Sequence, residues 1–238
     1  MISNKKQLGQ FFTKNSDYIL NGFTKYIKDK NVTDPFAGGS DLIRWAKNNK
    51  IKEIKGYEVD KKYIDNKIIF FNDSINKPLK YDFVLTNPPY LNVNKADKET
   101  KMKYFHNFDF EDLYQISLSS IMNSEEGIVI VPINFLSAQN SKKVRNIFFF
   151  KFKIIEMNYF KHQVFSDTTY NVIAFYYKKK KNIYEDNFII KTHIYPENKI
   201  VNIKLSRDFN WSIGGDFLNI IKKEKDILGI KRLTEKDL

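Results

Sequence analysis

The sequence predicts an α/β fold built on a doubly wound, mostly parallel β-sheet. Apolar runs typical of buried strands alternate with segments of helical periodicity over most of the 238 residues, as in consecutive β-α-β units. Acidic residues and a glycine-rich turn follow several predicted strands, at the edge where an open parallel sheet binds its ligands. The length suffices for one sizeable core, or for a core with a short appendage.

The first predicted elements are a helix, a strand and a second helix. Asn15 or Ser16 can cap a helix that runs to about Lys28, with apolar residues along one face. Residues 31–36 then form a short strand that enters a glycine turn, and residues 41–50 form the next helix. This order is the beginning of a β-α-β unit.

The remaining predicted elements are mainly strands. An amphipathic helix over residues 110–124 precedes a strand rich in Ile and Val. A run of lysines at 178–181 is a predicted solvated turn, and a last helix begins near Asp216. The predicted strands cover residues 53–60, 67–73, 81–86, 127–135, 152–160, 170–178 and 187–195. This pattern divides the chain into a core of residues 1–195 and an extension of residues 196–238.

The chain is strongly basic and contains no cysteine. Lys and Arg number 40 against 28 Asp and Glu, for a net charge of +12 and a pI near 9.4. This charge favours a polyanionic partner such as nucleic acid, although compositional drift in a Lys- and Asn-rich chain gives the same balance. The lack of Cys excludes disulfides, a thiolate metal site and a Cys nucleophile. Because neither a signal peptide nor an apolar run of membrane-spanning length is found, we expect a soluble, cytoplasmic protein without membrane contact.

Three acidic residues stand at the ends of three successive predicted strands. Asp34 opens the turn DPFAGGSD, Glu58 ends the second strand and Asp73 ends the third. Gly38 and Gly39 let the backbone approach a ligand, while carboxylates accept hydrogen bonds from amines and ribose hydroxyls. Each feature alone is also typical of an ordinary turn or a helix N-cap, but their joint order favours a pocket for a nucleoside that carries an amino group. Phosphate binding is disfavoured, because the G-x-x-x-x-G-K-[ST] spacing is absent.

The fourth of these strands ends in Asn-Pro-Pro-Tyr at residues 87–90. With the glycine turn and the three acids, this motif makes residues 7–178 resemble the S-adenosylmethionine-dependent N6-adenine DNA methyltransferases of restriction-modification systems, with the γ order of motifs. The resemblance implies a Rossmann-like class I methyltransferase fold with an antiparallel strand near the C-terminal end of the core. It also implies S-adenosylmethionine as the cofactor and double-stranded DNA as the partner.

The resemblance assigns roles to the cofactor-binding residues. LGQFFT resembles the amino-terminal motif X, which implies that Thr13 and Gln10 lie near the methionine end of the cofactor. In the same way Asp34 corresponds to the contact with the cofactor's amino group, Glu58 to the ribose hydroxyls and Asp73 to the adenine amino group. The implied cofactor-binding residues are Gln10, Thr13, Asp34, Phe36, Ala37, Gly38, Glu58, Val59, Asp73, Ser74 and Asn87.

The catalytic role implied for Asn-Pro-Pro-Tyr has a chemical reason. Adenine's exocyclic nitrogen is a weak nucleophile, because its lone pair is delocalised into the ring. The side-chain oxygen of Asn87 and the carbonyl of Pro88 can accept hydrogen bonds from that amine, and Pro89 stiffens the turn that holds them. By resemblance, Tyr90 and Phe165 contact a target base that has been flipped out of the duplex. A structural interpretation stands beside each: a Pro-Pro turn that ends a strand, and a core phenylalanine.

Three alternatives stay open. A ribosomal RNA adenine methyltransferase is one, because KKQLGQFF also resembles the start of that family; a protein-glutamine methyltransferase, which also carries Asn-Pro-Pro-Tyr, is another. The third is a non-catalytic DNA-binding subunit of a modification complex. The chain departs from the γ pattern D-P-x-x-G-x-G at Ser40, which stands where the last glycine is expected and bears on cofactor affinity.

Two further basic segments concern the nucleic acid. Residues 92–107 are either a loop that orders over the flipped base or a solvated surface loop. The residues after Tyr177 are Lys-rich and too few for an independent core, so we expect them to contact phosphates. Site selection would then come from a separate or missing target-recognition domain. His106, His162 and His193 are scattered, and no metal site is expected.

Overall fold

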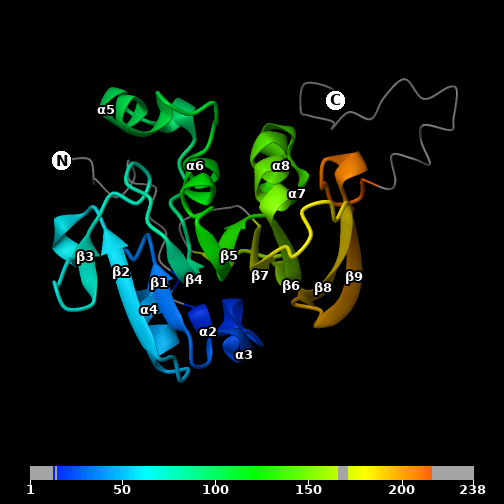
Figure 1. Cartoon of the computed structure of the whole chain (residues 1–238), viewed down its shortest axis with the longest axis horizontal. Helices are drawn as coiled ribbons and strands as arrows, with labels where there is room; N and C mark the ends of the chain where they lie inside the picture. Colours follow the sequence, from blue (N-terminus) through cyan, green and yellow to red (C-terminus); the bar gives the residue numbers. More distant parts are fainter. Residues whose placement is uncertain (1–12, 14, 166–170, 216–238) are drawn as a thin grey trace, which may run out of the picture.

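A nine-stranded sheet forms the centre of the computed structural model, which describes residues 13, 15–165 and 171–215. The strand order is β3-β2-β1-β4-β5-β7-β6-β8-β9 (Figure 1). The strands are β1 (Asn31–Asp34), β2 (Glu53–Glu58), β3 (Ile69–Phe71), β4 (Tyr81–Thr86), β5 (Ser124–Pro132), β6 (Phe152–Phe160), β7 (Val172–Lys179), β8 (Asn187–Tyr195) and β9 (Lys199–Ser206).

The two halves of this sheet differ in strand direction. From β3 to β5 every neighbouring pair of strands is parallel. In the other half, β7 runs antiparallel between β5 and β6, β8 is parallel to β6, and β9 is antiparallel to β8. The predicted α/β class and the antiparallel strand near the end of the core are confirmed. The mostly parallel description is matched in part: every pair from β3 to β5 is parallel, whereas in the other half only β6 and β8 are.

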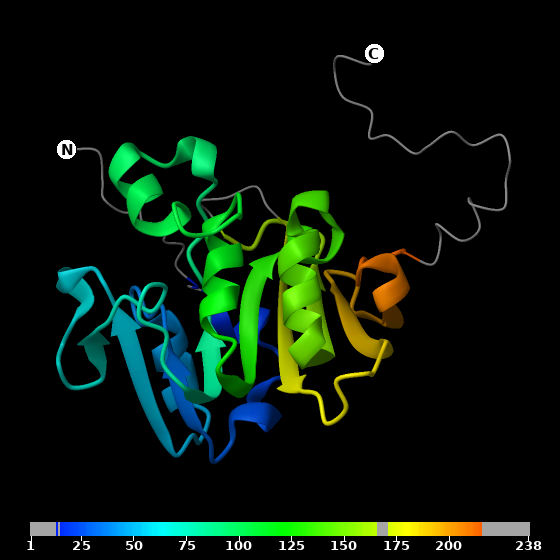
Figure 2. The ribbon, with the colours of Figure 1, turned by 45° about the horizontal axis from the view of Figure 1, so that its top comes forward.

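Helices cover both faces of the sheet, as in a doubly wound arrangement (Figure 2). The helices α2, α3 and α4 lie on one face, and α6, α7 and α8 lie on the other. The α-helices are α2 (Ser16–Ile19), α3 (Thr24–Ile27), α4 (Asp41–Lys47), α5 (Lys98–Thr100), α6 (Leu113–Ser120), α7 (Asn134–Ser137) and α8 (Lys142–Lys151). The remaining turns are the 3-10 helices η1 (Lys61–Tyr63), η2 (Val93–Lys95), η4 (Gln139–Ser141) and η5 (Arg207–Phe209) and the π-helix η3 (Lys101–Phe105).

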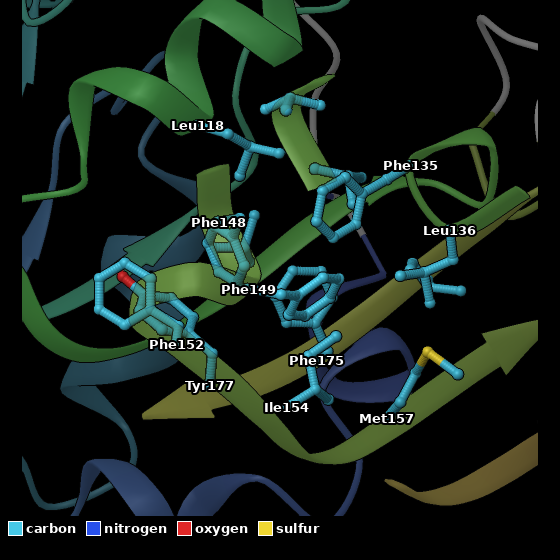
Figure 3. Packing of buried hydrophobic residues seen from close by; sticks show 14 of the residues in the cluster. Leu118, Phe135, Leu136, Phe148, Phe149, Phe152, Ile154, Met157, Phe175 and Tyr177 are labelled. Atoms are coloured by element: carbon cyan, nitrogen blue, oxygen red, sulfur yellow. The ribbon is translucent and has the colours of Figure 1, made fainter. Parts of the chain in front are cut away.

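Two large hydrophobic clusters hold these helices to the sheet. In the first, Phe148 of α8 lies edge-on to Phe175 of β7, with ring centroids 6.0 Å apart (Figure 3). The second cluster lies on the opposite face and includes Trp45 of α4. Neighbouring residues of β5 alternate between them, since Val129 belongs to the first cluster and Ile130 to the second. A strand buried on both faces is apolar along its length, which explains the run GIVIVP.

Several predicted boundaries are wrong for local reasons. The predicted first helix is two helices, because Gly22 has a φ of +80° and turns the chain between α2 and α3. No element was predicted for α8 or β9; the phenylalanines of α8 run directly into β6, which hides the helical period. β9 extends the same sheet beyond residue 195, and the division of the chain there stays a prediction. The helix predicted from Asp216 lies outside the described residues.

The predicted solvated turn at 178–181 is wrong at two points, because Lys178 and Lys179 belong to β7 and Lys180 is buried. Lys180 departs from the prediction most. Its side chain is only 5% exposed, and its Nζ lies 4.5 Å from the centroid of the Trp211 ring and donates to the carbonyl of Glu185 over 2.8 Å. Burial lowers the pKa of Lys180 to about 8, against an ordinary value of 10.5. The amine therefore packs the C-terminal segment against the sheet rather than facing solvent.

We predict that Lys180→Met removes a rise in stability between about pH 8 and 10.5. In that window the unfolded chain keeps a proton that the folded Lys180 has released, so the free energy of unfolding increases with pH. Urea unfolding of both proteins at several pH values measures the effect. Lys181→Met is the matched control, because Lys181 is exposed. An equal rise in wild type and Lys180→Met would contradict the assignment.

Candidate functional site

A pocket lies at the carboxyl ends of β1, β2 and β4, where the turns that follow these strands meet. It is the edge at which an open parallel sheet binds ligands. The predicted residues that line the pocket are Thr13, Asp34, Phe36, Ala37, Gly38, Glu58, Val59, Asp73, Ser74, Asn87 and Pro89. Of the residues predicted to bind a cofactor, Gln10 alone is missing from this set, because it lies outside the described residues. The structure thus brings the predicted acids and Asn87 to one place.

Asp34 is the most buried acid of the pocket, with a side chain that is 1% exposed. Its Oδ1 accepts hydrogen bonds from the Thr86 hydroxyl over 2.7 Å and from the Phe36 amide over 3.0 Å. Burial raises the pKa of Asp34 to about 7, even though both hydrogen bonds act in the opposite direction. Asp34 is therefore a carboxyl group whose ionised form gains from any cation brought into the pocket.

Glu58 fixes the glycine turn beside Asp34. One carboxylate oxygen accepts from the amide of Gly38 over 2.8 Å, and the other accepts from Val59 and Asp60 over 2.8 and 2.9 Å. Burial raises the pKa of Glu58, and the three amides oppose that shift. Because two oxygens carry three backbone contacts, Glu58 orders the turn on which any ligand would rest.

Ser40 adopts the backbone conformation that a glycine would take most readily. It has φ of +68° and ψ of 17°, in the left-handed region, at the N-terminus of α4. Ser40 replaces the glycine of the γ pattern at a position where the turn requires a positive φ. Serine tolerates this conformation at a cost of about 1–2 kcal/mol relative to the right-handed region.

Asp73 joins the β3–β4 connection to the segment that follows Asn-Pro-Pro-Tyr. Its carboxylate accepts from the backbone and side chain of Asn76 over 3.3 and 3.1 Å and lies 3.5 Å from the Nζ of Lys103. Lys103 and Tyr104 belong to η3, and Tyr104 lines the pocket with a side chain that is 4% exposed. The segment predicted as a loop over residues 92–107 is therefore folded in part into η2, α5 and η3, and it contributes Tyr104 to the lining of the pocket. Figure 2 shows the helical turns of this segment beyond the edge of the sheet.

Asn87 contributes its amide at the end of β4. Its Nδ2 donates to Thr13 Oγ1 over 3.1 Å, and its Oδ1 accepts from the Tyr90 hydroxyl over 2.7 Å. Pro89 lines the pocket beside it, whereas Pro88 and Tyr90 do not. The Tyr90 side chain is 7% exposed, with its ring edge-on to Tyr114 at a centroid distance of 6.2 Å.

Phe165 lies away from the pocket. Its side chain is 4% exposed and belongs to the second hydrophobic cluster, together with Phe160 and Val172. Contact of Phe165 or Tyr90 with a base stays a prediction, and both side chains would have to become exposed for it.

Some residues of the site were not predicted from the sequence. Thr86 immediately precedes Asn-Pro-Pro-Tyr on a strand that pairs with β1, so strand adjacency could have indicated its contact with Asp34. Tyr104 and Leu113 come from a segment whose path could not be inferred. Within residues 13, 15–165 and 171–215, no cluster of His, Asp and Glu could hold a metal ion. In the same part of the chain, no helix is long and apolar enough to cross a membrane.

Comparison of whole structures finds a similar fold in several solved methyltransferase structures. A modification subunit assigned to a type I restriction enzyme of Vibrio vulnificus shares 13% identity at a TM-score of 0.59, covering 93% of this chain and 54% of that one. The M protein of the type I restriction enzyme EcoKI shares 14% identity at a TM-score of 0.57, covering 78% and 49%. An RNA methyltransferase candidate from Pyrococcus horikoshii shares 18% identity at a TM-score of 0.53, covering 75% and 90%.

These similarities establish the fold. The chain has the Rossmann-like fold of S-adenosylmethionine-dependent methyltransferases. It spans about half the length of the two modification subunits that it resembles. No protein-family model matches the chain, and no curated protein sequence matches it either.

We predict that Thr86→Val destabilises the protein most where Asp34 is ionised. The substitution keeps the shape but removes a buried hydroxyl that donates to a carboxylate, a loss of about 1.5–3 kcal/mol in the free energy of unfolding. Because the pKa of Asp34 is about 7, the loss should be larger at pH 8.5 than at pH 5.5. Chemical unfolding at both pH values measures it, with Thr86→Ser as the control. A loss independent of pH would mean that the hydroxyl does not serve the Asp34 carboxylate.

Proposed function

We propose that the protein is an S-adenosylmethionine-dependent DNA methyltransferase that acts on the N6 amino group of adenine. The observation that carries the proposal is that Asn87 lines the same pocket as Asp34, Glu58 and Asp73. A group suited to accept hydrogen bonds from an amine therefore stands beside a set of acids suited to hold an aminated nucleoside.

The chemistry of the lining residues fits this cofactor. Asp34 would take the ammonium group, Glu58 the ribose hydroxyls and Asp73 the amino group of the adenine ring. The apolar side chains of Phe36 and Val59 provide surfaces for the flat ring. When bound, S-adenosylmethionine supplies an electrophilic methyl group on a sulfonium sulfur. The smaller lining residues, Ala37, Gly38 and Ser74, leave room for close backbone approach.

Asn87 and Pro88 would act on the target amine. Hydrogen bonds from the amine to Asn87 Oδ1 and to the Pro88 carbonyl draw its lone pair out of the ring, which makes the nitrogen a better nucleophile. These acceptors are held in place before the substrate arrives, since two prolines fix the backbone that follows Asn87. Tyr90 and Phe165 are proposed to contact the flipped base.

DNA is the favoured substrate for two reasons. The net charge of +12 suits a polyanion, and the structural neighbours include modification subunits of type I restriction systems. Because the chain covers only about half of those subunits, we propose that duplex recognition needs a separate or missing target-recognition domain. RNA is the second candidate, since the RNA methyltransferase candidate is matched over 90% of its own length.

The decisive experiment offers substrates in parallel. Labelled S-adenosylmethionine is incubated with duplex DNA, with RNA and with a glutamine-containing protein, and the labelled product is identified. We expect N6-methyladenine in DNA. Label in RNA alone would select the second candidate, and label in glutamine would replace both. Binding of DNA without transfer to any of them would indicate a non-catalytic subunit.

Asn87→Ala should reduce turnover by about two orders of magnitude or more while cofactor affinity changes little. The variant removes a preorganised hydrogen-bond acceptor that acts on the reacting amine. Single-turnover transfer measures the rate, and calorimetry with S-adenosylhomocysteine measures the affinity. A fully active Asn87→Ala protein would be incompatible with the proposed chemistry.

Cofactor binding should strengthen as the pH rises from 5 to 7. Since the pKa of Asp34 is about 7 in the folded protein, most chains carry a neutral Asp34 at pH 5, and an ammonium ligand must displace its proton. At the low end the dissociation constant should fall by up to about tenfold per pH unit. Calorimetry across this range measures the slope, and Asp34→Asn should bind weakly and without it. An equal slope in Asp34→Asn would assign the titration to another group.

A further inference from the structure

The side-chain amide of Asn87 is held at both ends by hydroxyl groups. Its Nδ2 donates to Thr13 Oγ1 over 3.1 Å, and its Oδ1 accepts from the Tyr90 hydroxyl over 2.7 Å. The exposed fractions of Thr13, Asn87 and Tyr90 are 3%, 9% and 7%. An amide carries donors at one end and acceptors at the other, so its action on an amine depends on which way it faces. Contacts at both ends are the means by which a protein can set that direction.

The Tyr90 hydroxyl has a second acceptor within reach. Its oxygen lies 2.8 Å from the carbonyl oxygen of Ile130 in β5, in addition to its contact with Asn87. A phenol has one proton and can donate to only one of these acceptors at a time. Burial raises the pKa of Tyr90 well above its ordinary value, which keeps the proton on the oxygen. The Tyr90 hydroxyl can therefore donate its proton either to Asn87 Oδ1 or to the Ile130 carbonyl.

The ring that carries this hydroxyl is packed against a neighbouring ring in this structure. Tyr90 packs edge-on to Tyr114 of α6, and the Tyr114 hydroxyl is in turn hydrogen-bonded to the buried Ser141 over 2.7 Å. The Ile130 carbonyl belongs to a strand paired on both sides, so it does not move independently of the sheet. Turning the Tyr90 hydroxyl proton from one acceptor to the other therefore costs less free energy than moving the Tyr90 ring or the backbone of β5.

We propose that Thr13 and Tyr90 are positioning residues for Asn87, and that the Tyr90 hydroxyl reserves the Asn87 oxygen for the target amine. This inference rests on the proposed function and extends it. Thr13 holds Nδ2 and so keeps Oδ1 turned toward Tyr90. Before the substrate arrives, Tyr90 donates to Oδ1; when the amine donates there, the Tyr90 proton turns to the Ile130 carbonyl.

In this arrangement Asn87 Oδ1 accepts a hydrogen bond both before and after the target amine binds. A buried acceptor without a donor is costly, and the movable proton serves whichever of the two oxygens needs it. Without the Thr13 hydroxyl, Nδ2 loses this acceptor, and the orientation that presents Nδ2 to the amine becomes less disfavoured. Two donors would then face each other, and the acceptor would be lost.

The orientation can be tested without any reaction. In ¹⁵N–¹H spectra of the full chain, the side-chain resonances of Asn87 are assigned by their loss in Asn87→Asp. Thr13→Val should shift the Nδ2 resonances strongly, whereas Tyr90→Phe should shift them much less, because Tyr90 contacts the oxygen. Thr13→Ser keeps the hydroxyl and should restore the wild-type resonances. A strong shift in Tyr90→Phe with none in Thr13→Val would mean that the amide faces the other way, and would overturn the proposal.

The consequence for catalysis is tested in single-turnover methyl transfer. Thr13→Val should lower the single-turnover rate at saturating cofactor by about tenfold, as expected for one misplaced hydrogen bond. Saturation separates this loss from any effect of Thr13 on cofactor affinity. Thr13→Ser should recover the rate. In an Asn87→Asp background, Thr13→Val should have no further effect on the rate, because the two carboxylate oxygens are equivalent.

Two results would contradict this positioning role. A rate loss that persists in the Asn87→Asp background, or one that appears mainly in cofactor affinity, would show that Thr13 acts elsewhere. Absence of transfer by the wild-type chain to any nucleic acid would overturn the proposed function instead, and the spectra would still report the orientation of the amide.

Discussion

Desolvation of a carboxyl group at the end of β1 is the constraint on which the site depends. Asp34 is 1% exposed, and its partners in the described part of the chain are a hydroxyl and a backbone amide, both neutral. Burial therefore raises its pKa to about 7 and leaves its ionised form only partly compensated. A cationic ligand would supply the missing stabilisation. Two contacts keep the Asp34 carboxyl group in place. Glu58 orders the turn that surrounds it, and the Thr86 hydroxyl from β4 donates to it.

Strand pairing explains how the distant parts of the site come together. β1 lies between β2 and β4, so the turns after three strands converge beside Asp34. β4 also pairs with β5, which places the Ile130 carbonyl within reach of Tyr90. The parallel half of the sheet thus builds the pocket. β5 joins this half to the antiparallel half, where aromatic side chains of α8 and β7 pack together.

Part of this arrangement could be predicted from the sequence, because it depends on local rules. The ends of parallel strands share one edge, so Asp34, Glu58 and Asn87 could be placed together from strand order alone. The contacts of Thr13 and Tyr104 could not be predicted, since they depend on how separate segments fold over that edge. Local exceptions were missed as well: Gly22 divides the first helix, and no element was predicted for β9. Lys180 was predicted to be solvated because it stands in a run of lysines. Its burial could not be predicted, since the aromatic residue that its amine contacts comes from later in the chain.

A crystal structure of the chain with S-adenosylhomocysteine tests the central claim most directly. The claim is that the three acids and Asn87 belong to one binding site for an aminated nucleoside. We predict that the ligand lies in this pocket, with its ammonium group at Asp34, its ribose hydroxyls at Glu58, its adenine amino group at Asp73 and its sulfur toward Asn87. A ligand bound elsewhere, or bound here with its amino acid end away from Asn87, would contradict the account.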